Sequence, residues 1–258
     1  MSGRISVLVT KEEIRPERLE GTTTVVVDVF MATTTLLTIL GHGARRVFPV
    51  GDLEEAAART REIDPERLLR GGEQMARRVE GFDCGPYPEE FPAAVVEGRD
   101  VVYVSTNGTA AIARARPASR LLIASVRNAP AVAAHLERTR PEKIYIACAG
   151  SLGRLALDDL AGAACILSHM EREGWSGNDG TQLAWDLADL YDGRIPDLLR
   201  RSRAGRWFFE NGETDSFDFV ADVGATNLVA EVREGQLVRV DSSEVGTSRA
   251  GSAEEARA

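Results

Sequence analysis

Residues 25–35 read VVVDVFMATTT, and residues 101–111 read VVYVSTNGTAA. In each stretch a run of β-branched apolar residues leads into hydroxyl-bearing residues, which open a segment of helical composition. A near-continuous apolar strand followed by a helix is typical of a parallel sheet that is covered on both faces. These two stretches therefore predict an α/β fold in which both strands lie inside the sheet.

Further apolar runs alternate with segments of helical length along the chain. Strands are expected at 25–30, 46–50, 67–71, 101–105, 120–125 and 143–150. Helices are expected at 32–42, 52–62, 108–115, 128–138 and 156–174. This alternation predicts a layered α/β/α architecture with a largely parallel or mixed sheet.

The two opening stretches are related by one ungapped offset of 76 residues, which also superposes Asp52 on Asn128. We interpret this phase as an internal duplication of a βαβαβ unit, with halves at about 25–74 and 101–150, whose sheet-end loops face one shared cleft. The alternative is that all βα units look alike at low identity.

The domain organisation is simple. Residues 1–240 are expected to form a single α/β domain, with helical segments over 156–210. Residues 71–91 are rich in Gly and Pro and predict a long loop, which in a compact domain is usually functional. The tail 241–258 lacks aromatic residues and aliphatic periodicity and predicts disorder.

The composition limits the classes of partner. Forty acidic and 31 basic residues among 258 give a net charge of −9, which disfavours a nucleic-acid or anionic-membrane partner. No window reaches the ~18 apolar residues of a membrane span, and the first residues lack the apolar core of an export signal. Three cysteines suit a reducing compartment. A cytoplasmic location is expected, and a homo-oligomer is left open.

Asp28 stands in a strand whose neighbours predict burial on both sides. An unpaired carboxylate there would be costly, so it should have a cation or several donors. One interpretation is an acid that accepts N–H bonds from the following ATTT turn. The other is a metal ligand or a residue of phosphoryl chemistry at the carboxyl end of a strand, where open α/β sheets place their sites.

The segment Ser105-Thr106-Asn107-Gly108-Thr109 follows a strand and opens a helix. Free N–H groups at a helix N-terminus, with a glycine that allows close approach, form an anion site. The alternative is ordinary helix capping. Two such loops at matched phase, ATTT and STNGT, favour a shared anion cleft.

Two further acidic positions suit Mg²⁺, which typically takes one or two carboxylates and leaves room for water and phosphate oxygens. Glu73, after Gly71-Gly72, ends another strand and could face Asp28. Asp158 and Asp159 lie near the start of the 156–174 helix. For this pair the alternative is compensation of the helix dipole.

A competing signal is Cys148 followed by Arg154, a spacing that resembles cysteine-dependent phosphatases. No histidine precedes this cysteine, and a free cysteine in a strand is usually core packing. Neither a Walker loop nor GxGxxG is present. His42, His135 and His169 lack ligand spacing, which argues against zinc.

Five blocks, taken together, resemble the successive motifs of the 2-phosphosulfolactate phosphatase family. They read VVVDVFMATTTLLTIL, GGEQMARRVEGFDCGPYPEEF, VSTNGTAAI, ASVRNAPAVA and CAGSLGRLALDDLAGA, and their order and spacing match from about residue 5 to residue 170. The resemblance implies an α/β Mg²⁺-dependent phosphatase that converts 2-phosphosulfolactate to sulfolactate and phosphate, a step of coenzyme M synthesis. By the same analogy the motif positions are Asp28, Thr33, Thr34, Glu73, Thr106, Asn107, Gly108, Thr109, Ser125, Asn128, Gly150 and Asp158.

The sequence departs from the family pattern at two cations. Met31 stands where the family has an arginine before Ala-Thr, and Gln74 stands where an arginine follows Gly-Gly-Glu. An arginine binds phosphate or sulfonate bidentately in a way that neither replacement can. Arg127 and Arg154 are candidates for restoring this positive charge.

The leading hypothesis is metal-assisted hydrolysis of a small anionic phosphomonoester. Its catalytic residues are Asp28, Glu73 and Asn107, and its Mg²⁺ ligands are Asp28, Glu73 and Asp158. Its substrate-binding residues are Thr33, Thr34, Thr106, Gly108, Thr109, Ser125, Arg127, Asn128, Gly150 and Arg154. The alternatives are a phosphatase that uses Cys148 and Arg154, and a non-catalytic anion-binding homologue.

Overall fold

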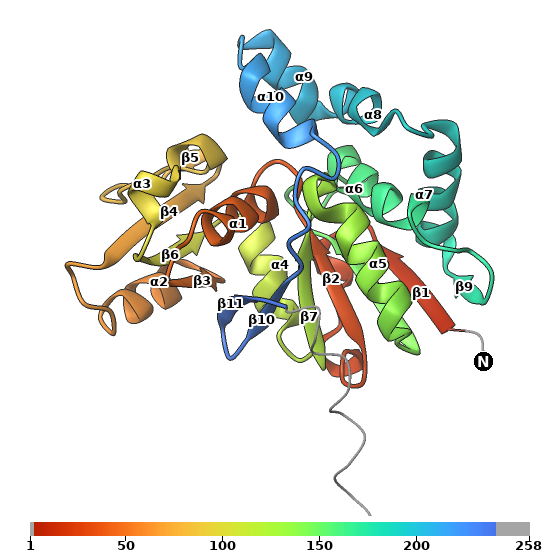
Figure 1. The fold of residues 1–258 in the computed structure, drawn as a ribbon, viewed down its shortest axis with the longest axis horizontal. Helices are drawn as coiled ribbons and strands as arrows, with labels where there is room; N and C mark the ends of the chain where they lie inside the picture. The colour runs from red at the N-terminus through yellow and green to blue at the C-terminus, as the bar shows by residue number, and fades with distance from the viewer. Residues whose placement is uncertain (1–2, 241–258) are drawn as a thin grey trace, which may run out of the picture.

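The structure, a computed structural model, describes residues 3–240. Within these residues eleven strands form one mixed sheet in the order β5-β4-β6-β3-β11-β10-β7-β2-β8-β1-β9 (Figure 1). The strands are β1 Gly3–Leu8, β2 Thr23–Val27, β3 Arg46–Val50, β4 Leu68–Gln74, β5 Arg77–Arg78, β6 Asp100–Val104, β7 Arg120–Ala124, β8 Lys143–Cys148, β9 Trp175–Gly177, β10 Ala230–Arg233 and β11 Gln236–Arg239. The expected α/β fold with a mixed sheet is confirmed, and the expected tail 241–258 lies outside the described residues.

The helices follow the sequence pattern closely. They are α1 Ala32–Gly41, α2 Leu53–Thr60, α3 Ala93–Val96, α4 Gly108–Ala115, α5 Ala129–Thr139, α6 Leu157–Ser168, α7 Asp179–Leu190, α8 Ile195–Arg201, α9 Arg203–Glu210 and α10 Thr214–Ala221. Asp52 caps α2 by accepting the N–H of Glu55 at 2.8 Å, as the sequence suggests.

The helix expected at 156–174 is shorter than predicted. It ends at Ser168, where the Ser168 hydroxyl and the His169 ring both contact the carbonyl of Cys165 at 2.8 Å. These side chains satisfy a carbonyl that the helix leaves free, and the chain turns toward β9. The loop expected at 71–91 likewise contains the end of β4, the short strand β5 and a 3₁₀ turn at Pro88–Glu90.

Two regions of sheet were not predicted. β1 pairs in parallel with β8 and with β9 at one end of the sheet. The antiparallel hairpin β10–β11 lies between β7 and β3 in the middle of the sheet. Both depend on pairing with distant segments, which local periodicity does not report.

The repeated βαβαβ order is present in both halves, and the halves interleave. β6, the first strand of the second half, lies between β4 and β3 of the first half. In the same way β2, the first strand of the first half, lies between β7 and β8 of the second half. The order β4-β6-β3 on one side of the hairpin therefore mirrors β8-β2-β7 on the other, as a two-fold relation between the halves requires.

The offset between the halves is not constant, which corrects the ungapped alignment. Val27 pairs with Cys148 in the same way that Val104 pairs with Gly72. Val27 thus corresponds to Val104 at an offset of 77, whereas Thr33 and Thr109 in the following helices correspond at 76. The first half carries one extra residue between strand and helix.

The sheet separates two layers of helices, and strand residues alternate between them. Val25 and Val27 pack with α5 and α6 on one face, whereas Val26 packs with α1 and α4 on the other. All five residues of β2 are buried, as expected for an interior strand. Helices α8–α10 form a separate group beyond the sheet, at the top of Figure 1.

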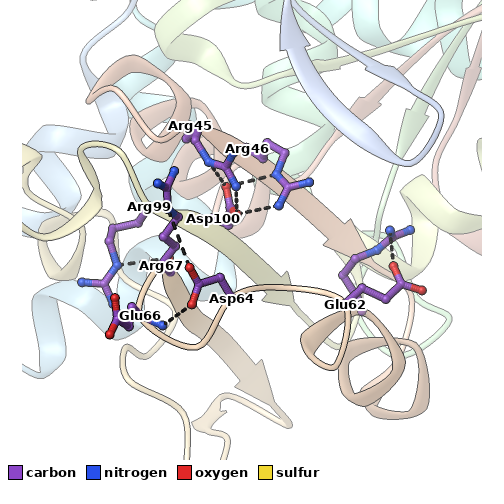
Figure 2. Close-up of polar contacts among 9 residues, drawn as sticks. Arg45, Arg46, Glu62, Asp64, Glu66, Arg67, Arg99 and Asp100 are labelled. Atoms are coloured by element: carbon purple, nitrogen blue, oxygen red, sulfur yellow. Dashed lines mark hydrogen bonds and ion pairs between the residues drawn. The ribbon is translucent and has the colours of Figure 1, made fainter.

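A buried carboxylate joins β3 and β6 at their amino ends, opposite the side where α1 and α4 begin. Asp100 has no solvent exposure and accepts hydrogen bonds from both Arg45 and Arg46 (Figure 2). These two guanidinium groups hold the pKa of Asp100 below its usual range, although burial opposes them. The ion pairs of Asp100 with Arg45 and Arg46 thus fix the amino ends of β3 and β6 relative to each other.

Two exclusions from the sequence can be compared with the structure. None of the helices in the described range 3–240 has the length and apolar character needed to cross a membrane. Cys84, Cys148 and Cys165 are all buried and free, which agrees with the absence of a disulfide framework.

Candidate active site

The helices α1 and α4 begin next to each other where β2 and β6 end. A Cβ atom on Gly108, the first residue of α4, would lie 2.4 Å from the Asp28 carboxylate and 2.5 Å from the Ala32 Cβ. Only glycine fits this contact, because real Cβ atoms do not approach so closely. Gly108 therefore brings the STNGT turn directly against Asp28.

The turn after each of the two strands is built by a buried threonine. The N–H of Asp28 donates to Thr33 Oγ1 at 3.0 Å, and that hydroxyl lies 2.7 Å from the Asp28 carbonyl. The N–H of Ser105 donates to Thr109 Oγ1 at 2.7 Å, and the hydroxyl returns to the Ser105 carbonyl at 3.0 Å. Ser105 thus occupies the position that Asp28 holds in the other half.

Asp28 is only 7% exposed and carries an unusual proton affinity. Its carboxylate contacts one nearby backbone donor, the N–H of Ala32, at 3.4 Å. Burial, reinforced by the negative charges of Asp158 and Glu73, raises the pKa of Asp28 to about 7. A cation placed here would relieve this unfavourable charge.

The first turn of α6 brings two more buried carboxylates to the same place. Burial raises the pKa of Asp158 to about 6, against the nearby positive charge of Arg203 and a hydrogen bond from Ser202. Asp159 accepts the N–H of Val29 at 3.0 Å and the N–H of Gly150 at 2.8 Å. Asp159 therefore fixes the ends of β2 and β8, a role that the sequence did not separate from that of Asp158.

Glu73 reaches the site from β4 and is held by the STNGT turn. Its carboxylate accepts the N–H of Thr106 at 2.5 Å and the Thr106 hydroxyl at 2.9 Å. It also accepts the N–H of Ala76 at 2.6 Å. Glu73 and Thr106 are thus brought together, a contact that the sequence did not predict, and the Glu73 oxygens are already bound to donors of the protein.

Asn107 connects three loops and brings in a cation that the sequence did not indicate. Its side-chain oxygen accepts Lys11 Nζ at 2.7 Å and lies 3.4 Å from the N–H of Leu152. Lys11 also forms an ion pair with Glu12 at 3.1 Å. Within residues 3–240 the N–H groups of Asn107 and Gly108 have no acceptor. They remain available to an anion.

Three hydroxyl groups predicted to bind substrate serve the fold instead. Thr33 and Thr109 build the two turns described above, and Thr34 Oγ1 donates to the Val29 carbonyl at 2.8 Å. All three side chains are fully buried. Gly150 contributes its N–H to Asp159 and adopts a positive φ of 68°. These residues shape the strand ends rather than presenting free donors.

The ASVRN segment is likewise committed elsewhere. Asn128 accepts the N–H of Ser125 at 2.9 Å and donates to the Leu228 carbonyl at 3.0 Å. The guanidinium of Arg127 bonds to the Phe219 carbonyl and lies 3.8 Å over the Phe219 ring. The structure thus uses Ser125, Arg127 and Asn128 to start α5 and to hold α10, and does not join them to the carboxylate cluster.

The cysteine alternative does not agree with the structure. Cys148 has no solvent exposure, and burial next to Asp159 and Asp158 raises the pKa of its thiol well above the usual value. A thiolate is therefore strongly disfavoured. Arg154 is exposed and forms a backbone bridge with Ser151 in a loop that precedes α6. The N–H groups that follow Cys148, at residues 149–151, already donate to Val27, Asp159 and Arg154.

The predicted metal set needs one correction. Within residues 3–240, no group of three or more His, Cys, Asp or Glu side chains is arranged to hold an ion. Glu73 accepts hydrogen bonds from Thr106 and Ala76. Asp28 and Asp158, whose charges repel each other inside the protein, remain a pair. Two carboxylates agree with Mg²⁺, which keeps several waters.

Two of the C-terminal helices, α9 and α10, pack next to the candidate site. Phe30, two residues after Asp28, packs against Phe208 of α9 at 5.0 Å and against Phe217 of α10 at 5.9 Å between ring centroids. Arg203, at the start of α9, donates to Ser151 Oγ at 2.6 Å. No local sequence signal indicates that α9 reaches the β8–α6 loop, because the contact joins residues 52 positions apart in the chain.

Known proteins resemble this chain over most of its length. A family model described as 2-phosphosulpholactate phosphatase matches residues 8–235. A probable 2-phosphosulfolactate phosphatase of Symbiobacterium thermophilum is 38% identical over 87% of this chain and 97% of its own. Proteins with the same description in Deinococcus radiodurans and Clostridium acetobutylicum are 36% and 32% identical, over 83% and 91% of this chain and 88% and 100% of their own.

Proposed function

Because the chain belongs to the 2-phosphosulfolactate phosphatase family, we propose that it is a Mg²⁺-dependent phosphatase. Its substrate is 2-phosphosulfolactate or a related small phosphomonoester, and its products are the alcohol and phosphate. The observation that most supports this proposal is the pair of buried carboxylates, Asp28 and Asp158, beside the unpaired N–H groups that begin α4. Sulfolactate released in this way would serve coenzyme M synthesis in the cytoplasm.

Asp28 and Asp158 are the residues that would hold the metal ion. Their mutual repulsion and burial make the empty pair unfavourable, so a divalent cation gains more here than at an exposed carboxylate pair. When bound, Mg²⁺ supplies charge neutralisation for the phosphate and positions a water near phosphorus.

The start of α4 would orient the phosphate oxygens. Within residues 3–240 the N–H groups of Asn107 and Gly108 at this helix start have no acceptor in the protein, so they can donate to an anion. Lys11, bonded to Asn107, adds a positive charge beside them. Such preorganised donors stabilise charge in the transition state more than water does.

Glu73 has the role of a positioning residue in this proposal. Its bonds to Thr106 fix the turn that carries Asn107 and Gly108. Asp159 fixes the opposite side through Val29 and Gly150. These two carboxylates keep the strand ends, and hence the proposed ligands, at constant separation.

The test is a phosphate-release assay on purified protein with a set of small phosphomonoesters that includes 2-phosphosulfolactate. We expect release with Mg²⁺, loss of release after EDTA treatment, and recovery when Mg²⁺ is restored. Release that EDTA does not affect would contradict the metal role. Stabilisation by sulfolactate or phosphate with no release from any ester would instead support the non-catalytic homologue.

A further inference from the structure

Arg203 lies at the edge of the site although its helix is remote in sequence. It is the first residue of α9, and its guanidinium donates to Ser151 Oγ at 2.6 Å across 52 residues of chain. Ser151 belongs to the loop between β8 and α6. The contact therefore places a positive charge from the C-terminal helices on a loop of the candidate active site.

The Ser151 end of this loop is close to the proposed phosphate-binding groups. The next residue, Leu152, presents its N–H to the same Asn107 oxygen that binds Lys11, at 3.4 Å. The preceding residue, Gly150, is bonded to Asp159. Arg203 also acts on Asp158, whose carboxylate it stabilises through its charge. Arg203 is therefore bonded to a loop whose neighbouring residues contact Asn107 and Asp159, and its charge acts on the proposed metal ligand Asp158.

Arg203 forms no close ion pair within residues 3–240, although its charge acts on Asp158. In the described part of the chain, no carboxylate forms an ion pair with it, and its one hydrogen-bond partner is the neutral Ser151 hydroxyl. Other arginines differ: Arg45 and Arg46 share Asp100, and Arg127 is bonded and stacked at Phe219. Arg203 is also exposed, so a small molecule can reach the remaining N–H groups.

We propose that Arg203 determines specificity by binding a second acidic group of the substrate, a carboxylate or a sulfonate. This inference rests on the proposed function, since it places the phosphate itself at α4 and the metal. The planar guanidinium can bind such a group with two parallel hydrogen bonds. The site then selects phosphomonoesters that carry an acid group near the ester and discriminates against neutral ones.

The experiment compares kinetics on three substrates: 2-phosphosulfolactate, 2-phospholactate and the neutral-backbone ester glycerol 2-phosphate. Arg203→Ala should raise KM for the two acid-bearing esters about tenfold, the loss expected for one charge-assisted contact. It should leave KM for glycerol 2-phosphate within about twofold, because an effect of Arg203 on Asp158 would act on all three esters alike. Arg203→Lys should recover part of the loss, because it keeps the charge without the fork.

The matched control is Arg206→Ala. Arg206 lies one turn further along α9, is also exposed, and bonds to the carbonyl of Arg201, outside the candidate site. Its removal should change none of the kinetic constants. Arg154→Ala tests the competing assignment from the sequence, since Arg154 lies on the same loop as Ser151. A selective rise in KM from Arg154→Ala rather than from Arg203→Ala would overturn the proposal.

Two results separate this inference from the proposed function. Calorimetric titration with sulfolactate measures binding without turnover, and Arg203→Ala should weaken it about tenfold while Arg206→Ala should not. If the wild-type protein hydrolyses no ester but shows this difference, the phosphatase proposal fails and the Arg203 assignment stands. Equal binding by the wild type and Arg203→Ala, or an equal loss on all three esters, would overturn it.

Discussion

The two halves of the molecule build the same strand-to-helix turn but equip it differently. Thr33 and Thr109 close equivalent turns with equivalent hydrogen bonds, yet the first half places Asp28 where the second places Ser105. The N–H of the next residue is also bound by a carboxylate in both halves, from Asp159 to Val29 and from Glu73 to Thr106. The backbone frame is thus duplicated, whereas the charge that supports chemistry is found on one side only.

This comparison separates two origins of the site. The backbone frame comes from the repeated order of strands and helices and from the hydrogen bonds that close the two turns. These hydrogen bonds are not specific to catalysis. The proposed chemistry comes from single side chains: Asp28, whose equivalent is the uncharged Ser105, and Asp158, which lies in α6 after the second half. Substitutions at equivalent positions can therefore test frame and chemistry independently.

The largest difference is expected between Asp28→Asn and Ser105→Ala. Asp28→Asn removes a proposed metal ligand at constant shape, and kcat should fall about a thousandfold or more. Ser105→Ala removes an acceptor for the Thr109 N–H and should lower stability by about 1 kcal/mol with kcat nearly unchanged. Steady-state phosphate release and Mg²⁺ titration measure both. Near-normal turnover by Asp28→Asn would remove Asp28 from the mechanism.

A large structural difference is expected at Gly72 and Cys148, which occupy equivalent positions beside Val104 and Val27. Gly72 has a φ of 125°, and a Cβ there would lie 1.9 Å from the Val104 carbonyl oxygen. Gly72→Ala should destabilise the protein by roughly 3 kcal/mol or more. Cys148→Ala, in a regular strand, should cost about 1 kcal/mol. Urea unfolding of both variants decides whether the halves differ as described.

When no metal is present, the pH dependence of the protein's stability should depend on Asp28 and not on its equivalent residue Ser105. The pKa of Asp28 is about 7 in the folded protein, against 3.8 for an unperturbed aspartate such as one in the unfolded chain. As pH rises, the unfolded chain therefore loses this proton at a lower pH than the folded protein does. Stability should therefore fall as pH rises from about 4 to about 7, by on the order of 4 kcal/mol from this group.

The control for this effect is again the equivalent residue. In EDTA, Asp28→Asn should make the decline smaller and Ser105→Ala should keep it, while Mg²⁺ should reduce the decline in the wild type. Thermal unfolding at a series of pH values makes the measurement. A wild-type stability that rises over this range would contradict the assigned pKa.

The smallest effect is expected for Cys148→Ser. Because the thiol is buried and its pKa is raised, it should not attack phosphorus, and kcat should stay within about twofold of the wild type. Phosphate release by the purified Cys148→Ser variant and the wild type checks this. Loss of activity with an unchanged unfolding curve would restore the cysteine alternative.

The sequence predicted most of the elements that these comparisons use. Val25–Val27 is a continuous apolar run, so its burial on both faces could be read directly. Asp52 and the STNGT segment marked the starts of α2 and α4 by their side-chain chemistry. Such signals are local, since they depend on a few neighbouring residues.

The remaining features depend on contacts that are distant in the chain. The interleaving of β2 and β6 cannot be predicted from periodicity, because exchanged first strands have the same local pattern as unexchanged ones. The internal use of Thr33 and Thr34 could not be separated from ligand binding, since both need hydroxyl groups at a turn. Lys11 and Arg203 reach the site only through tertiary packing.

The exchange of first strands has a consequence for synthesis on the ribosome. β2 leaves the exit tunnel early, but its neighbours β7 (120–124) and β8 (143–148) are made much later in the chain. The emerging chain must therefore keep an apolar strand unpaired through much of translation. The hairpin β10–β11, which fills the centre of the sheet, is completed later still. Early β2 is thus the segment of the nascent protein with most to gain from a chaperone.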